Sequence, residues 1–185
     1  MKENSKILFD ERGITPGSTY QKGQWKKIAI HDKENICGFF GRYRFLSNFW
    51  PAKIFLDNEE YSSVENAYQA AKYKKERRDF LKTCSPKEAI VFSKNNPLNK
   101  IEQAKWKKRR LKIMEKLLKQ KFDKKLNPEN HKKLLLTKNK HLEESNYWGD
   151  VYWGVHKQNK NEPGYGKNTL GKLLMKIRQH IRKPK

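Results

Sequence analysis

The sequence contains few cysteines and no long apolar run. Cys37 and Cys84 are the only cysteines in 185 residues, and their spacing matches no metal-binding motif. Disulfide-rich domains use more cysteines in a shorter chain, so we expect two reduced thiols. No stretch approaches the roughly 20 apolar residues of a membrane-spanning helix, and residues 1–13 are too polar for a signal-peptide core. These absences predict a cytoplasmic protein that does not contact a membrane.

Acidic residues are also scarce. The chain has 20 Asp and Glu against 43 Lys and Arg, which gives a net charge of +23. A mean hydropathy of −1.08 would suit a disordered chain, but 12% of the residues are aromatic and supply the apolar groups that disordered chains lack. The composition and length therefore predict one folded domain with a basic surface.

The positive charge is concentrated in the middle of the chain. Residues 72–140 contain 24 basic and 7 acidic side chains, a net charge of +17. Such a surface attracts polyanions by counterion release, so nucleic acid is an expected partner of this region. The alternative is that the lysines only form solvated helix faces that keep the protein soluble.

Cap residues and apolar spacing predict several helices. Ser62 with Glu65 three residues later reads as a capping box, and Ser85-Pro86 and Asn127-Pro128 are typical helix starts. The longest apolar pattern follows Asn99. We therefore expect helices at 62–80, 85–93, 99–122, 131–136 and 169–181.

Strands are predicted mainly in the aromatic part of the sequence. Residues 36–56 favour two short strands around an aromatic loop, with Asp57-Asn58 as a turn, and residues 141–144 favour another strand. Residues 149–168 are rich in glycine and are expected to form a loop. The fold class is thus predicted as α+β, a helix-rich single domain with a few short strands.

Four ordered segments carry a resemblance to a known family. They are residues 41–49 (GRYRFLSNF), 63–72 (SVENAYQAAK), 150–154 (DVYWG) and 166–175 (GKNTLGKLLM). At these residues the sequence resembles the NADAR family, also called YbiA-like. The resemblance implies a YbiA-like catalytic domain at 38–181 and leaves residues 1–37 as an N-terminal extension or arm of unknown function.

The resemblance implies an N-glycosidase that needs no metal and no cofactor. Family members hydrolyse N-glycosidic bonds in early riboflavin-pathway intermediates or in ADP-ribose attached to guanine of nucleic acids. The family's functional glutamate matches Glu65, its tryptophan Trp106 and its aspartate Asp150. Lys72 matches a lysine associated with a covalent imine route.

The residue types suit this chemistry. Glu65, Gln69 and Lys72 lie at i, i+4 and i+7, so they share one helix face. Loss of a base from a ribose develops oxocarbenium character, which Glu65 and Asp150 could stabilise or assist as acid and base. Lys72 could instead form a Schiff base if burial lowers its pKa.

Each of these residues also has a structural interpretation. Glu65 could only cap its helix, Lys72 could be a solvated side chain, and Asp150 could shape a turn. Trp106 could be a core aromatic instead of a stacking wall for a base.

Further residues are expected to bind the substrate. Arg42 and Arg44 could hold a pyrophosphate, and Gly166-Lys167-Asn168 could bind an anion at a helix N-terminus through backbone N–H groups. The five histidines have no metal-ligand spacing. The expected substrate-binding set is Arg42, Arg44, Phe45, Asn48, Tyr68, Gln69, Trp106, Trp153, Gly166, Lys167 and Asn168.

The sequence therefore predicts an N-glycosidase that removes ADP-ribose from guanine in DNA or nucleotides. The basic region 72–140 favours this substrate over a free riboflavin intermediate, which needs fewer phosphate contacts. The competing interpretation is a non-catalytic module that binds nucleic acid or ADP-ribose through basic and aromatic side chains.

Overall fold

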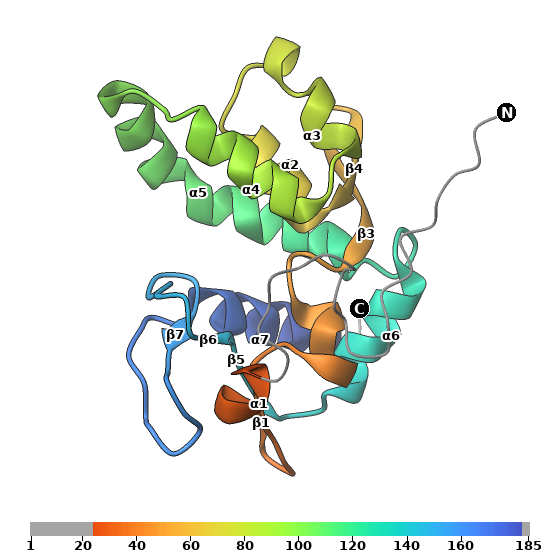
Figure 1. The fold of residues 1–185 in the computed structure, drawn as a ribbon. Coiled ribbons are helices and arrows are strands. Elements are labelled where there is room, and N and C mark those ends of the chain that lie inside the picture. Colours follow the sequence, from red (N-terminus) through yellow and green to blue (C-terminus); the bar gives the residue numbers. More distant parts are fainter. Residues whose placement is uncertain (1–23, 183–185) are drawn as a thin grey trace, which may run out of the picture. The chain divides into compact units, whose positions relative to one another are not determined.

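A computed structural model describes residues 24–182, which fall into two compact units (Figure 1). Of the described residues, unit 1 contains 24–47 and 139–175, and unit 2 contains 48–138 and 176–182. Helices predominate and the strands are short, which confirms the predicted helix-rich α+β class.

The first element of unit 2 is a β-hairpin. Strand β3 (Pro51–Leu56) pairs antiparallel with β4 (Glu59–Ser63), and Ile54 lies opposite Tyr61. The predicted turn is confirmed, since Asp57 and Asn58 have φ values of 52° and 65°, as a two-residue hairpin turn of the type I′ class requires.

Helix α2 (Val64–Ala70) begins one residue later than predicted. Its N-cap is Ser63, whose hydroxyl accepts a hydrogen bond from the Asn66 N–H at 3.1 Å, whereas Ser62 is an exposed residue of β4. The expected pairing of Ser62 with Glu65 is therefore wrong. The strand's alternation places Ser63 on the buried side, where its hydroxyl meets the helix.

Helix α2 is also shorter than predicted, because the chain returns to it. The buried Asn66 amide donates to the carbonyl oxygens of Leu81 at 3.0 Å and Cys84 at 2.8 Å. The intervening residues form the short helices η2 (Lys75–Arg77) and α3 (Asp79–Thr83) instead of continuing α2 to residue 80.

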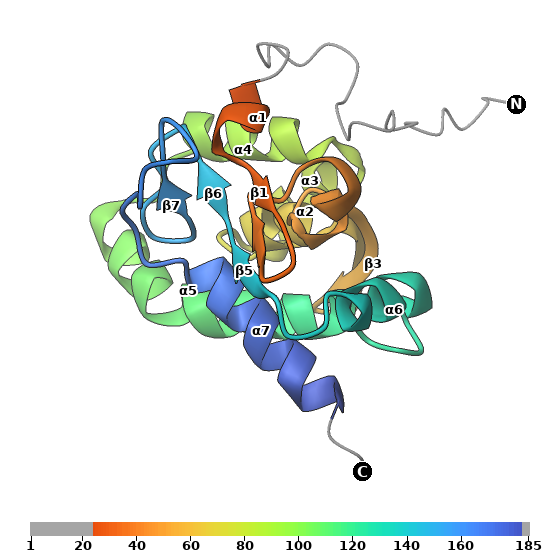
Figure 2. The same ribbon diagram turned by 90° about the horizontal axis from the view of Figure 1, so that it is seen from below.

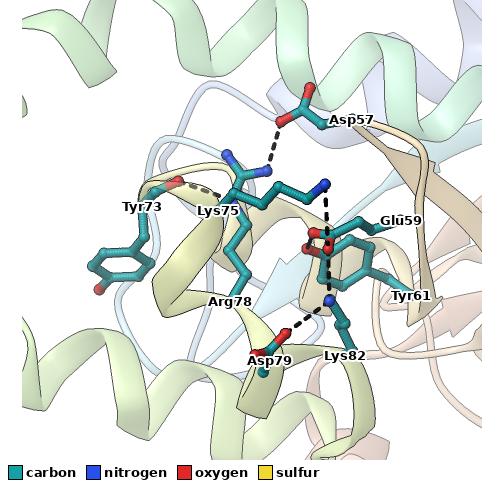
Figure 3. Close-up of polar contacts among 8 residues, drawn as sticks. All are labelled: Asp57, Glu59, Tyr61, Tyr73, Lys75, Arg78, Asp79 and Lys82. Carbon is teal, nitrogen blue, oxygen red and sulfur yellow. Dashed lines mark hydrogen bonds and ion pairs between the residues drawn. The ribbon is translucent and has the colours of Figure 1, made fainter.

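Ion pairs fasten this returning segment to the hairpin (Figure 3). The buried Arg78 pairs with Asp57 at 2.5 Å and donates to the Tyr73 carbonyl at 2.8 Å. Lys82 lies between Glu59, at 2.6 Å, and Asp79, at 2.8 Å. The hairpin turn, η2 and α3 are thus held together by charge-assisted contacts.

The remaining helices of unit 2 begin where local caps predicted them. Ser85 and Asn99 form capping boxes that open α4 (Pro86–Asn95) and α5 (Lys100–Lys121). Helix α6 (Pro128–Leu136) has its proline in the first turn. Helix α2 packs against both α4 and α5, as Figure 1 shows, and α5 buries Trp106, Met114, Leu117 and Leu118.

Unit 1 is built around a small three-stranded sheet (Figure 2). After α1 (Gln24–Ile28), β1 (Ile30–His31) pairs antiparallel with β2 (Asn35–Cys37), which pairs parallel with the predicted strand β5 (His141–Glu143). The part of the expected N-terminal arm that the structure describes therefore belongs to a sheet. Residues 1–23 lie outside the described residues.

The aromatic segment between β2 and β3 contains no strand, which confirms the prediction of two short strands around an aromatic loop. Residues 41–46 form the 3₁₀ helix η1 (Gly41–Leu46), with Phe45 and Leu46 buried. Gly38 and Gly41 have φ values of 80° and 52°, which end the extended chain despite the β propensity of the aromatics. Strand formation resumes at β3.

The rest of unit 1 is largely loop, as predicted. Strand β6 (Ser145–Asn146) pairs parallel with β7 (Val155–His156). Helix α7 (Thr169–Arg182) follows, its first half assigned to unit 1 and its second half to unit 2. No helix between residues 24 and 182 combines the length and apolarity needed to cross a membrane.

Candidate functional site

The predicted site residues occur in both units, and each group is described separately. Unit 2 holds Asn48, Glu65, Tyr68, Gln69, Lys72 and Trp106. Unit 1 holds Arg42, Arg44, Phe45, Asp150, Trp153, Gly166, Lys167 and Asn168.

Glu65 is a buried carboxylate at the start of α2. It is 8% exposed, and it accepts a hydrogen bond from Gln69 Nε2 at 2.5 Å. The capping contact of the helix runs between Ser63 and Asn66, so the interpretation of Glu65 as only a helix cap is wrong. The i, i+4 spacing lets Gln69 orient the carboxylate, which is the arrangement that a catalytic acid or base needs.

Two buried amide oxygens in unit 2 have no hydrogen-bond donor among the described residues. They are Oε1 of Gln69 and Oδ1 of Asn48. The Asn48 carbonyl accepts from the Glu65 N–H at 3.1 Å, and Asn48 Nδ2 faces Met114 Sδ at 3.6 Å. Buried acceptors without donors are rare in folded proteins, and both would suit the hydroxyl groups of a bound sugar.

Lys72 lies two residues beyond the end of α2, near the rings of Tyr68 and Trp106. Its Nζ is 5.9 Å from the ring centroids of both Tyr68 and Trp106, and 3.4 Å from Ser93 Oγ. Burial lowers the pKa of Lys72, and the negative charge of Glu65 opposes this by less. Lys72 is thus not the fully solvated side chain of the alternative interpretation, and a larger neutral fraction makes it a better nucleophile.

Tyr68 and Trp106 form an aromatic wall. Their ring centroids lie 4.9 Å apart at an interplanar angle of 57°, and Trp106 is 8% exposed. Arg109, one turn after Trp106, donates to the Ala71 carbonyl at 2.8 Å and places its guanidinium 5.5 Å from the Trp106 ring. Arg109 is not among the predicted site residues, although its i+3 spacing from Trp106 is a usable signal.

Asp150 shapes a turn in unit 1 with one of its two oxygens. Its Oδ1 accepts from the N–H groups of Tyr152 at 3.0 Å and Trp153 at 2.9 Å. The Asn146 side chain holds the Asp150 backbone: its Nδ2 donates to the Asp150 carbonyl oxygen at 2.7 Å, and its Oδ1 accepts from the Asp150 N–H at 3.0 Å. Oδ2 has no donor within residues 24–182, so a structural role for Oδ1 leaves the second oxygen available for chemistry.

The backbone around Lys167 does not form the predicted anion site. The N–H groups of residues 167–170 all donate to carbonyl oxygens of the loop at 151–154. A Cβ at Gly166, whose φ is 148°, would lie 2.2 Å from the Gly154 oxygen, so glycine is required there. The prediction of anion binding by these N–H groups is therefore wrong, because the loop has already filled them.

Asn168 has a structural role instead. Its φ is 50°, its Oδ1 accepts from the Glu144 N–H at 3.1 Å, and its Nδ2 donates to the Leu142 carbonyl at 2.9 Å. The exposed Lys167 places Nζ 5.7 Å from the Tyr152 ring. Asn168 fastens the start of α7 to β5, and Lys167 is left as the part of this segment that could reach a phosphate.

The arginines of η1 differ in exposure. Arg42 is exposed and lies 4.8 Å from the Tyr43 ring, whereas Arg44 is partly buried and donates to Ser47 Oγ at 3.3 Å. Phe45 is buried in unit 1. Phosphate binding by Arg42 and Arg44 stays a prediction.

Among residues 24–182 no three side chains of the metal-ligating types gather at one point.

This chain is similar in sequence to proteins of a known family. The family model of the NADAR domain matches residues 38–182. N-glycosidase YbiA of Escherichia coli strain K12 is 32% identical over 162 residues, which cover 80% of this chain and 90% of the relative. N-glycosidase YbiA of Shigella flexneri is 31% identical over 160 residues, with the same coverage.

A solved structure shares the fold as well. The NMR structure of the E. coli protein YbiA matches with a TM-score of 0.63 and 27% identity, covering 85% of this chain and 90% of that one. The motifs, the family model and the structural match agree: this chain belongs to the NADAR domain family.

Proposed function

We propose that this chain is an N-glycosidase that hydrolyses the bond between ADP-ribose and guanine in DNA or nucleotides. The N-glycosidase relatives support the reaction class. The observation that carries the proposal is the cluster of Glu65, Gln69 and Lys72, which we call the α2 cluster. In it Gln69 orients the buried Glu65, and the charge of Glu65 acts on the amine of Lys72, which follows the helix.

Glu65 suits stabilisation of the transition state. As the bond between the base and the anomeric carbon breaks, positive charge develops on the ribose ring. A carboxylate in a site of low dielectric constant stabilises that charge more strongly than one in water. Water then supplies a hydroxyl group to the anomeric carbon, and the remaining proton ends on the departing base.

Asp150 is proposed as the second acid or base, acting through Oδ2. The contacts of its Oδ1 with two backbone N–H groups hold the carboxylate in one orientation. A fixed carboxylate can deliver a proton to the base or accept one from the attacking water.

Lys72 offers a covalent route to the same products. Its neutral amine would attack the anomeric carbon as the base leaves, the sugar ring would open to an imine, and water would hydrolyse that imine to release ADP-ribose and the free amine. The lowered pKa of Lys72 favours this route because it increases the fraction of neutral amine.

The aromatic wall and the charge favour a nucleic-acid base as the leaving group. Tyr68 and Trp106 present ring surfaces beside Lys72 on which a purine could stack. The net charge of +17 between residues 72 and 140 suits a substrate with several phosphates.

The test is turnover of a defined substrate. The protein is incubated with an oligonucleotide ADP-ribosylated on guanine, and released ADP-ribose is measured by chromatography for wild type and Glu65→Gln. We expect release by wild type and its loss in the variant. Release that survives Glu65→Gln would overturn the role of Glu65. Hydrolysis of early riboflavin intermediates alone, or tight binding of ADP-ribose without any release, would overturn the proposed substrate.

A further inference from the structure

Five basic residues of α5 lie on one face of the helix. They are Lys105, Arg109, Lys112, Lys116 and Lys119, and all are exposed. Their spacing of four, three, four and three residues keeps them in one line along the helix, which we call the α5 stripe. At 1.5 Å per residue the stripe is about 21 Å long.

The stripe is poorly neutralised by the protein itself. On α5, Glu102 belongs to the N-terminal capping box, and Glu115 pairs with Lys119 at 3.2 Å and with Lys176 at 3.0 Å. Lys105, Lys112 and Lys116 have no ion-pair partner within residues 24–182. Like charges three and four residues apart destabilise a helix, so this arrangement differs from the alternating charges that stabilise a solvated helix.

One end of the stripe reaches the aromatic wall. Arg109 belongs to the stripe, yet its guanidinium also donates to Ala71 and lies over the Trp106 ring. A strand following the stripe would therefore pass beside Trp106, within the same unit.

The other end runs into a basic hollow of unit 2. Lys119 lines this hollow together with Lys124, Lys125 and Lys176, while Glu115 and Asp123 are its acidic members. Glu115 is already paired with lysines, and Asp123 accepts from the N–H groups of residues 125 and 126. The positive charge thus extends beyond the end of α5.

We infer that the α5 stripe binds the sugar-phosphate backbone of a nucleic-acid strand, so that the enzyme binds a polymeric substrate more tightly than a free nucleotide. At roughly 3.4 Å per phosphate along one strand, the stripe spans about six phosphates. The identity of the base beside Trp106 rests on the proposed function, whereas backbone binding by the stripe does not.

The test separates binding from turnover. Binding of unmodified single-stranded DNA, duplex DNA and RNA is measured by fluorescence anisotropy over a range of salt concentrations. The variant is K105E/K112E/K116E, which spares Arg109 and Lys119. The control K26E/K27E/K160E reverses three exposed lysines of unit 1 and changes the net charge equally.

We expect the stripe variant to weaken binding of at least one of these nucleic acids by at least tenfold at low salt. The slope of log K against log salt should fall by about 2 for a single strand, since each lost phosphate contact removes about 0.7. The control should change binding by less than about threefold, as expected for a change in net charge away from the binding surface. Equal weakening by both variants, or no weakening by either, would overturn the proposal whether or not the protein is an enzyme.

Turnover provides a second readout. With an ADP-ribosylated oligonucleotide the stripe variant should show a raised KM and an unchanged kcat, while with an ADP-ribosylated mononucleotide both values should match wild type. A KM that is unchanged for the oligonucleotide would contradict the stripe as a substrate track. Absence of turnover in every protein, with the binding difference intact, would reject only the proposed function.

Discussion

The α2 cluster in unit 2 and the loop at 150–168 in unit 1 use polar residues in different ways. On α2, Glu65 and Gln69 bond to each other and leave Gln69 Oε1 without a donor in the described part of the chain. In the loop, Asp150 and Asn168 bond mainly to backbone N–H and carbonyl groups. The first region keeps hydrogen-bonding capacity for a ligand, and the second uses it to hold its own shape.

The same sequence pattern, polar residues beside aromatics, therefore serves a different physical role in each region. Polar residues beside aromatics occur in both regions, and both belong to the segments that resemble the family. A polar residue in a regular helix has its backbone satisfied, so its side chain is available for chemistry. In an irregular loop the backbone groups need partners, and side chains such as those of Asn146 and Asn168 supply them.

The largest expected effect is on kcat, and it differs between the carboxylates of Glu65 and Asp150. Glu65→Gln should lower kcat for ADP-ribose release by about 10³-fold, because it removes the charge that stabilises the transition state. Asp150→Asn should lower kcat by about 10²-fold, because its Oδ1 can still accept from residues 152 and 153 while the acid is lost. Kinetics and thermal melts of both variants check this.

Both proteins should melt within about 2 °C of wild type, since each change is isosteric. Full activity of Asp150→Asn would assign Asp150 to turn formation alone.

A large effect on stability is expected in the loop. Asn168→Ala should lower the free energy of unfolding by about 3 kcal/mol, since it unpairs the Glu144 N–H and the Leu142 carbonyl and places alanine at a positive φ. Chemical denaturation checks it. Asn168→Asp keeps the acceptor and should cost roughly half as much. A silent Asn168→Ala would contradict the structural role of this residue.

A smaller effect on kcat is expected for Lys72, and it should depend on pH. The pKa of Lys72 is lowered from 10.5, so the neutral amine accumulates as pH rises through that lowered value. If the imine route operates, kcat should rise with pH over this range, and Lys72→Met should lower kcat by roughly 30-fold. Lys72→Arg, which stays charged, should abolish the rise. Reductive trapping with cyanoborohydride should add the mass of the sugar adduct to wild type and to neither variant.

Stability provides a control on the same residue. A lysine with a lowered pKa in the folded state destabilises the fold fully below that value, and the effect disappears above 10.5. Lys72→Met should therefore raise the unfolding midpoint at pH 7 more than at pH 10. Equal effects at both pH values would indicate that the amine is not desolvated.

The smallest effect is expected on KM and concerns Lys167, whose exposed side chain could still bind a ligand. Lys167→Ala should raise KM by less than about threefold and leave stability unchanged, because its side chain is exposed. Titration of activity against substrate checks it. A tenfold rise in KM would show that this segment binds phosphate after all.

Local signals explain which parts of the fold were predictable. Helices α4 and α5 follow the caps Ser85 and Asn99 as predicted, because a capping box depends only on its own few residues. Helix α6 begins at Pro128 as the Asn127-Pro128 signal indicated, but the Asn127 side chain bonds to Lys53 and Gln120 and does not cap the helix. The end of α2 depends on contacts of Asn66 with residues 81 and 84, which lie far beyond the window of a periodicity pattern. The aromatic loop between β2 and β3 was predictable as well, because Gly38 and Gly41 adopt positive φ values and interrupt the extended chain locally.

The candidate site likewise has a part that local spacing predicts and a part that depends on long-range contacts. The contact of Glu65 with Gln69 follows from helical spacing, so sequence reasoning could predict it. The prediction that Lys72 shares this helix face is wrong, because α2 ends at Ala70. The N–H groups of residues 167–170 donate hydrogen bonds to the carbonyl oxygens of residues 151–154. These groups lie about 15 residues apart in the sequence and meet only in the folded loop, so no local pattern predicts the bonds. Helical spacing alone also gave no sign of Ser93, whose hydroxyl meets Lys72 from another helix.

The double contact of Asn66 has a consequence for how this enzyme could change over evolution. Leu81 and Cys84 must keep their distance along the chain, because one amide group holds both carbonyls next to α2. Within the described residues, the exposed Glu76 of η2 makes no such contact, whereas Lys75 and Arg78 beside it pair with Glu59 and Asp57 of the hairpin. Insertions at Glu76 would lengthen a loop without moving Glu65, whereas a single added residue between 81 and 84 would shift the helix that carries it.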